Sequence, residues 1–428
     1  MRMPRSLAVC SAAAVALGVA SAPGQAAATA TATARAVPAP PAAPVVLAPP
    51  VPPAVRAGSD AAGPAAGLVQ RPAPAPRAPR LRVGTVKRGL DIPWGLNFLP
   101  NKAMLYTQRD RLVIRYRTRG GRDHQVRFDR GGMWSSGETG LMAILAAKTF
   151  TRTRHFYMPR RALAPTERAR RPGRHVEADA ERAAGRTRRA DRAGSAGQLR
   201  ATRGCRLRYG PEGALYIGTG DAAVAKNAQS LRSGGGKVLR VRPRTGRGWP
   251  SNPFSHAQSA MKRRVFTYGH RNVQGLALRP GRGMWSVEHG SFRDDEVNRL
   301  KKRGNYGWDP GPGYDESVPM TDFSLPGKQV GARWKSGNPT ITPSGAAWLR
   351  GGKWGVWQGC LAMAVLGDSH LRILKFTREG RFVRSWRPAR LDGSRLRTAQ
   401  LGPGGNLYLT TSNGGGNDRI LRVVPRRR

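Results

Sequence analysis

The amino-acid sequence predicts an all-β fold and, within that class, a six-bladed β-propeller. The first observation is an internal repeat in which a strand end, a Pro/Gly turn and a new strand follow one another. Looser copies begin at Leu349 and lie within residues 145–157. The six copies begin 47 to 71 residues apart, as four-stranded blades with functional loops would. The clearest copies are residues 98–106 (FLPNKAMLY), 209–217 (YGPEGALYI), 278–286 (LRPGRGMWS) and 401–409 (LGPGGNLYL).

Single strands can also be located. Residues Val265–Tyr268 and Met284–Val287 are short runs of β-branched and aromatic residues bounded by Gly, Pro and Asn, which is typical of strands. Near the end of the sequence, Arg419–Val424 (RILRVV) has the same character. We expect it to be the strand that closes the propeller.

Residues 1–25 are typical of a secretory signal peptide. Basic Met1–Arg5 is followed by the apolar run Leu7–Val19 and by small residues at 20–22. This run is too short to span a membrane stably. The sequence therefore predicts a secreted, extracellular protein with no transmembrane segment in the mature chain.

The next segment, residues 26–80, consists almost entirely of Ala, Pro, Val and Gly, without a period. Such a composition predicts a disordered or polyproline-like linker. The folded domain is accordingly expected at residues 81–425.

The chain is strongly basic, with 74 Lys and Arg against 25 Asp and Glu. Such a charge raises the question of nucleic acid, acidic polysaccharide or another anionic surface as a partner. The arginines are spread along the chain instead of forming one stripe, which favours a solvated basic surface and no specific nucleic-acid site. A non-catalytic basic propeller that binds glycans or polyanions stays open as an alternative function.

Three cysteines are present. Cys10 lies inside the apolar run, which argues against a lipoprotein anchor. Cys205 and Cys360 remain in the mature chain, where they could pair in an oxidising compartment or both stay free.

The stretch from Val265 to Trp308 concentrates residues suited to a site. Arg271 offers a planar fork of donors for a carboxylate, and Asn272 adds a donor and an acceptor. Gly290 and Ser291 offer backbone carbonyls, and residues 294–296 (DDE) supply the hard oxygen ligands that Ca²⁺ prefers. An arginine in a loop, or three successive acids, is more often only solvated surface. Their adjacency indicates an anion clamp beside a cation site.

A series of short motifs runs in order from residue 81 to 424 apart from one gap. It comprises residues 93–96 (PWGL), 137–141 (GETGL), 206–213 (RLRYGPEG), 218–221 (GTGD), 235–241 (GGKVLRV), 268–275 (YGHRNVQG), 288–290 (EHG), 294–296 (DDE), 304–308 (GNYGW), 340–345 (TITPSG) and 395–397 (RLR). With these motifs the sequence resembles a known family, the soluble quinoprotein glucose/sorbosone dehydrogenases. The resemblance implies a six-bladed propeller that oxidises aldose sugars with pyrroloquinoline quinone (PQQ) and Ca²⁺, and it does not identify the electron acceptor.

The resemblance also implies roles for particular residues. Carbonyls of Gly290 and Ser291 would bind the Ca²⁺ that polarises the quinone, and Glu138 would lie near the substrate. Where the family often has a lysine that contacts PQQ, this chain has Gly367. The implied PQQ contacts are Arg271, Asn272, Thr340, Arg395 and Arg397. The implied ligands of a second, structural Ca²⁺ are Glu296, the Tyr306 carbonyl and Glu316.

The main departure concerns the catalytic base. Family members carry a histidine shortly before the strand at residues 206–209, and a neutral imidazole suits removal of the sugar hydroxyl proton. This chain has Thr202 at that position. Threonine cannot act as that base, so the catalytic residue is unidentified.

The gap in the resemblance coincides with an aberrant segment, residues 159–204. It holds 13 arginines and only three large apolar residues, Leu163, Val176 and Leu199. Without apolar residues at period 2 it cannot form half-buried strands, so one blade is expected to be degraded here. We hypothesise a compensated frameshift that cost the protein its activity, the alternative being a natural disordered insertion.

Overall fold

The computed structural model describes residues 77–130, 133, 135, 137, 139–159 and 205–426. The predicted signal peptide and most of the predicted linker lie outside the described residues. The degraded segment falls outside as well, apart from Pro159. No helix in the described part of the chain is long and apolar enough to cross a membrane.

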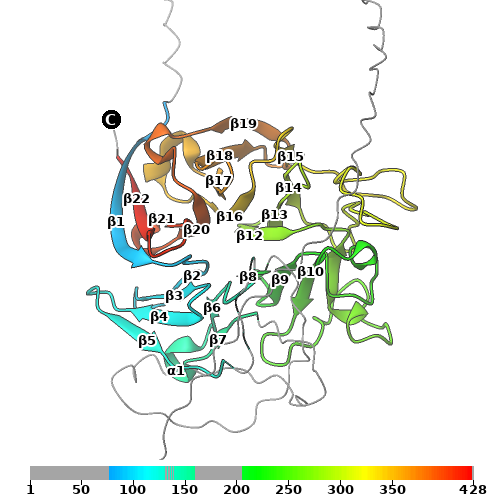
Figure 1. The fold of residues 1–428 in the computed structure, drawn as a ribbon, viewed down its shortest axis with the longest axis horizontal. Coiled ribbons are helices and arrows are strands. Elements are labelled where there is room, and N and C mark those ends of the chain that lie inside the picture. The colour runs from blue at the N-terminus through cyan, green and yellow to red at the C-terminus, as the bar shows by residue number, and fades with distance from the viewer. Residues whose placement is uncertain are drawn as a thin grey trace, which may run out of the picture. The chain divides into compact units, whose positions relative to one another are not determined.

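The described residues form an all-β propeller arrangement whose antiparallel sheets surround a centre (Figure 1). Five sheets have four strands and one has two, so the expected six four-stranded blades are found as five. The first two four-stranded sheets are β2 (Leu96–Phe98), β3 (Met104–Gln108), β4 (Val113–Arg117) and β5 (Asp123–Val126), then β8 (Cys205–Tyr209), β9 (Leu215–Thr219), β10 (Lys237–Val241) and β11 (Val265–Tyr268). The next two are β12 (Val273–Arg279), β13 (Gly283–Glu288), β14 (Glu296–Arg299) and β15 (Trp334–Lys335), then β16 (Pro343–Trp348), β17 (Leu361–Val365), β18 (Leu371–Phe376) and β19 (Phe382–Trp386).

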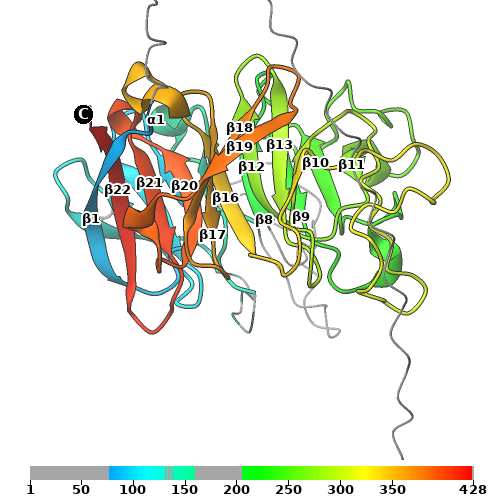
Figure 2. The same ribbon diagram turned by 90° about the horizontal axis from the view of Figure 1, so that it is seen from above.

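The fifth sheet joins the two ends of the folded domain. It contains β20 (Leu396–Leu401), β21 (Leu407–Thr411), β22 (Asp418–Arg426) and β1 (Arg80–Leu90). β1 pairs with β22 in antiparallel register, and both views show the two strands side by side (Figures 1 and 2). The predicted closing strand at 419–424 is therefore confirmed.

The two-stranded sheet is β6 (Leu145–Ala146) with β7 (Phe156–Tyr157), joined by the short helix α1 (Phe150–Thr153). It occupies the place in the chain where the weakest repeat copy was predicted. Every one of the six repeat copies thus forms a strand, a connection and a second strand. The short 3₁₀ helices are η2 (Ala225–Asn227), η3 (Lys262–Arg264), η4 (Gly352–Trp357), η5 (Ala389–Leu391) and η6 (Pro403–Gly405).

Six strands, one from each sheet, line a narrow central cavity. They are the first strands of the repeat copies, β2, β6, β8, β12, β16 and β20, and their lining residues include Leu145, Leu276 and Ala399. Arg206 enters this cavity from β8 and lies 4.0 Å over the Trp94 ring. The centre of the propeller is therefore a packed core with buried guanidinium groups.

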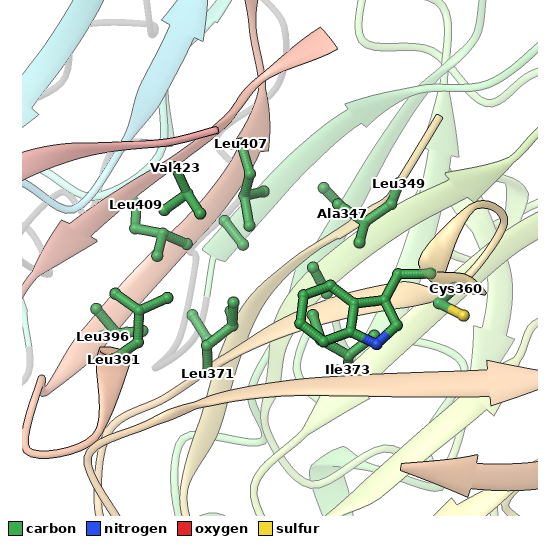
Figure 3. Packing of buried hydrophobic residues seen from close by; sticks show 14 of the residues in the cluster. Ala347, Leu349, Cys360, Leu371, Ile373, Leu391, Leu396, Leu407, Leu409 and Val423 are labelled. Atoms are coloured by element: carbon green, nitrogen blue, oxygen red, sulfur yellow. The ribbon is translucent and has the colours of Figure 1, made fainter. Parts of the chain in front are cut away.

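Between neighbouring sheets the core is apolar. The largest cluster packs β16–β18 against β20–β22, with Leu407 and Leu409 fully buried and facing Leu371 and Ile373 (Figure 3). Trp354 and Trp357 of η4 cover its edge. Cys360 is a buried free thiol in the same cluster. Each buried Leu or Ile of this cluster contributes roughly 1.5–3 kcal/mol by leaving water, which holds adjacent sheets together.

Candidate functional site

Four of the predicted site residues lie in two loops at one end of the sheets. β12 runs from this end to the Pro/Gly turn at Pro280, and β13 returns antiparallel to it. The β11–β12 connection and the β13–β14 loop therefore meet at the end opposite the turns. The first carries Arg271 and Asn272, and the second carries Gly290 and Ser291.

Arg271 is tied directly to the β13–β14 loop. Its Nη1 donates to the Gly290 carbonyl at 2.7 Å and to the His289 carbonyl at 3.4 Å. Its Nη2 donates to the carboxylate of Glu316, and the guanidinium lies 5.6 Å over the Trp308 ring. The anion clamp and the carbonyls predicted to bind Ca²⁺ are thus neighbours in space.

Asn272 is connected to Arg397 through one intermediate residue. Gln274 Nε2 donates to Asn272 Oδ1 at 3.3 Å, and Gln274 Oε1 accepts from Arg397 Nη1 at 3.3 Å. All three side chains are buried. Residues 125 positions apart in the sequence, predicted to contact the same cofactor, therefore do belong to one network.

His289 lies among three of the predicted arginines. Its backbone N–H donates to the Asn272 carbonyl at 3.1 Å, and a hydrogen bond to the backbone of Pro343 holds its ring. Burial, reinforced by the charges of Arg397, Arg271 and Arg395, lowers the pKa of His289 to about 3. The imidazole is therefore neutral at physiological pH in this positively charged site.

Arg395 approaches from the last sheet. Its Nε donates to the Ser412 carbonyl at 2.9 Å, and its Nη1 donates to the Leu366 carbonyl at 3.4 Å. A guanidinium thus reaches the loop where the family often places a lysine. A Cβ on Gly367 would come within 2.4 Å of Thr342 Oγ1, so the local packing leaves no room for a larger residue without a shift.

The three successive acidic residues, 294–296, make different contacts. Asp294 lies 3.5 Å from Lys335 Nζ. Asp295 is fully buried and accepts backbone N–H groups from Gly290, Ile341 and Thr342. It fixes the Gly290 loop against residues 341–342, although burial raises the pKa of Asp295.

Glu296 faces a buried polar cluster. It accepts hydrogen bonds from Thr321 Oγ1 at 3.0 Å and Asn298 Nδ2 at 3.1 Å. Asn298 also donates to Glu288, whose carboxylate lies 2.6 Å from His270 Nδ1. Burial and the nearby Glu288 raise the pKa of Glu296 to about 8. Two buried carboxylates in one cluster are the kind of donor set that a cation would stabilise.

The other predicted residues are placed as follows. The Tyr306 ring is buried and stacked on His270, with centroids 4.5 Å apart. Thr340 is half-buried, and its N–H donates to the Phe292 carbonyl in the β13–β14 loop. Glu316 lies with Arg271 and is about half exposed (47%). Glu138 and Thr202 lie outside the described residues.

Three buried polar atoms of this site have no hydrogen-bond partner among the described residues. They are Arg271 Nε, His289 Nε2 and Ser291 Oγ. An unpaired buried polar group costs about 1–3 kcal/mol, so such a concentration needs an explanation. A polar ligand between the β11–β12 and β13–β14 loops would supply partners: anionic oxygens could accept from Arg271 Nε and Ser291 Oγ, whereas the neutral His289 ring would need a donor at Nε2. Within the described ranges, no group of three or more His, Cys, Asp or Glu side chains is arranged to hold a metal.

Comparison with known proteins supplies the family. Residues 90–422 match the model of the family described as Glucose / Sorbosone dehydrogenase. The chain belongs to this family. Aldose sugar dehydrogenase YliI of Escherichia coli K12 is 27% identical to this glucose/sorbosone dehydrogenase family member over 374 residues, covering 81% of this chain and 93% of the relative.

Solved structures of aldose sugar dehydrogenases are similar to this chain as well. The PQQ-bound aldose sugar dehydrogenase of Streptomyces coelicolor has a TM-score of 0.63 at 27% identity, covering 82% of this chain and all of the other. The apo form of the soluble aldose sugar dehydrogenase of Escherichia coli has a TM-score of 0.65 at 25% identity, covering 81% of this chain and all of the other. The resemblance stated from the motifs is therefore confirmed, and an oxidoreductase of the sugar dehydrogenase type is supported.

The sequence-based prediction missed two residues of this site. Both His289 and Gln274 stood in quoted motifs without a role. An available signal was the spacing of Asn272 and Gln274, because alternate positions of a strand share one face. For His289 no local signal exists, since its surroundings come from segments far apart in the sequence.

Proposed function

We propose that this chain is a secreted sugar dehydrogenase scaffold that binds PQQ and Ca²⁺ and oxidises aldose sugars when its catalytic base is present. The observation that carries the proposal is the set of three unpartnered buried polar atoms beside three arginines. A non-catalytic binding platform gives no reason for that arrangement. Secretion, which the signal peptide predicted at residues 1–25 would direct, is part of the proposal.

Arg271, Arg395 and Arg397 would hold the cofactor's carboxylates, because guanidinium groups form paired, charge-assisted hydrogen bonds with carboxylates. Asn272 would contact a quinone oxygen, and Thr340 would add a hydroxyl. The carbonyls of Gly290 and Ser291 would hold a Ca²⁺ beside the quinone. The second Ca²⁺ would use Glu296, the Tyr306 carbonyl and Glu316, and the last of these would have to leave Arg271.

When bound, PQQ would supply a quinone that accepts a hydride from the sugar carbon. The protein must then take the hydroxyl proton, and the position expected for that base holds Thr202. A positioned general base contributes about 10²- to 10⁴-fold in rate. His289 does not replace it, because burial and the surrounding arginines oppose protonation of its ring.

We further propose that β6 and β7 are the remainder of a sixth blade. The segment from 159 to 204 would supply its missing strands and the base if its coding sequence were read in the alternative frame. The test is dye-linked aldose oxidation, with PQQ and Ca²⁺ added, by the written and the frame-restored proteins. We expect activity only after restoration. Equal robust activity in both would disprove the frameshift hypothesis, and PQQ binding without any aldose oxidation by either would disprove the proposed substrate.

A further inference from the structure

Lys237 is a fully buried cation outside the residues discussed so far. It is the first residue of β10, and its Nζ donates to three carbonyl oxygens, of Asn227 at 2.7 Å, Ala228 at 2.8 Å and Gly235 at 2.6 Å. All three belong to the β9–β10 loop. The ammonium therefore occupies a cage of carbonyls much as a bound cation would.

The same loop contacts the Arg271 segment along its whole length. The N–H of Gly269 donates to the Ala228 carbonyl at 2.9 Å, and the N–H of His270 donates to the Gly236 carbonyl at 3.2 Å. The Arg271 carbonyl accepts from Asp221 N–H at 2.8 Å, and Asn272 forms a bridge with Gly220. Four successive residues, 269–272, which include Arg271 and Asn272 of the anion clamp, thus contact this one loop.

Lys237 and the clamp share one atom. The Ala228 carbonyl oxygen accepts both the Lys237 ammonium and the Gly269 N–H. Lys237 also pairs with Tyr268, the residue directly before 269–272, in the β10–β11 register. The position of the Lys237 side chain therefore sets the position of the β9–β10 loop, which residues 269–272 contact.

The approach of the two loops is close. A Cβ on Gly236 would lie 2.4 Å from the His270 carbonyl oxygen, and Gly236 has a positive φ of 63°. Only glycine fits there without a shift. Because this contact is tight, a small movement of the β9–β10 loop also moves His270 and its neighbours.

We propose that Lys237 is a positioning residue for the cofactor site: its ammonium fixes the β9–β10 loop, and this loop holds Arg271 and Asn272 in the orientation that binds PQQ. The inference rests on the proposed function for its ligand. It does not make Lys237 a catalytic residue, since no contact with substrate or cofactor is implied. The nitrogen donor is required because a side chain without N–H groups would leave the buried carbonyls of Asn227, Ala228 and Gly235 without this partner.

The experiment compares Lys237→Met with a control of similar thermal stability, Leu407→Ala, which opens a cavity in the core between β17 and β21. Both are measured at the same interval below their own Tm. The first readout is hydrogen exchange of the backbone amides of residues 266–272 without cofactor. The second is PQQ affinity with Ca²⁺ present.

We expect Lys237→Met to raise exchange at Gly269 and His270 and to weaken PQQ binding by about 10- to 100-fold, since small misplacements of a site have effects of that order. Leu407→Ala should change neither. If the Met variant does not fold, Lys237→Gln replaces it, because its amide can donate two of the three hydrogen bonds, and a partial loss is expected.

Equal exchange and equal affinity in wild type and a folded Lys237 variant would overturn the inference, and so would equal losses in that variant and in the Leu407 control. If wild-type protein binds no PQQ, the proposed function fails. The exchange measurement then still decides whether Lys237 orders residues 269–272.

Discussion

Arg271 donates a 2.7 Å hydrogen bond from Nη1 to the carbonyl oxygen of Gly290. A residue predicted to hold the cofactor's carboxylate is thereby connected to a residue predicted to hold its metal. In the same two loops, Arg271 Nε, His289 Nε2 and Ser291 Oγ are buried without a hydrogen-bond partner among the described residues. One ligand that is both anionic and metal-binding explains this arrangement.

The first prediction concerns that arginine. Arg271→Lys keeps the charge but loses the planar fork, so we expect PQQ affinity to fall by about 10- to 100-fold, from the roughly 1.5–3 kcal/mol of a charge-assisted hydrogen bond. The control is Arg282→Ala, which removes a positive charge at the opposite, turn end of the sheets. Calorimetric titration checks both. A larger effect from Arg282→Ala would indicate general charge attraction in place of a clamp.

The second prediction concerns the buried carboxylate of Glu296. A ligand that binds only the folded state stabilises it by about 2.7 kcal/mol at 100 times its Kd. Glu296→Gln should therefore abolish the rise in Tm that Ca²⁺ produces in wild type, whereas Asp294→Asn should leave it. In chelator the Gln variant should be no less stable than wild type, because one of two neighbouring buried carboxylates is then neutral. Equal Ca²⁺ shifts in all three proteins would remove Glu296 from the metal site.

The third prediction is a pH dependence caused by Lys237, whose pKa burial lowers from 10.5 to about 7. Between these two values the unfolded chain holds a proton that the folded chain has released. Stability therefore rises with pH through this window, by at most about 1.4 kcal/mol per unit, and is independent of this group below it. Urea unfolding from pH 6 to 9 should show the free energy of wild type, minus that of Lys237→Met, increasing with pH. A flat or falling difference would mean that the buried amine keeps its proton.

Much of the fold was predictable because the repeat places a Pro/Gly turn between two apolar runs, and such turns constrain the chain locally. The partner of the closing strand was not predictable, since the β1–β22 pairing joins residues more than 300 positions apart. The count of six blades is not confirmed among the described residues, where β6 and β7 pair only with each other.

Within the site, the sequence predicted the location of the residues better than it predicted their hydrogen-bond and ion-pair partners. Asp295 looks like a metal ligand by composition, yet its carboxylate is occupied by three backbone amides. Glu316 was assigned to a metal by resemblance, and its carboxylate lies on Arg271. Such side-chain directions depend on loop conformations that are fixed by long-range contacts, as in the shared carbonyl of Ala228.

The most direct test of the account is a titration of wild-type protein with PQQ, with Ca²⁺ and then with chelator. We predict saturable binding at one site per chain in Ca²⁺, weakened strongly by chelator, because a tricarboxylate facing arginines and a metal is bound far better than by arginines alone. Absence of binding to folded protein in Ca²⁺, or binding of equal strength in chelator, would contradict it.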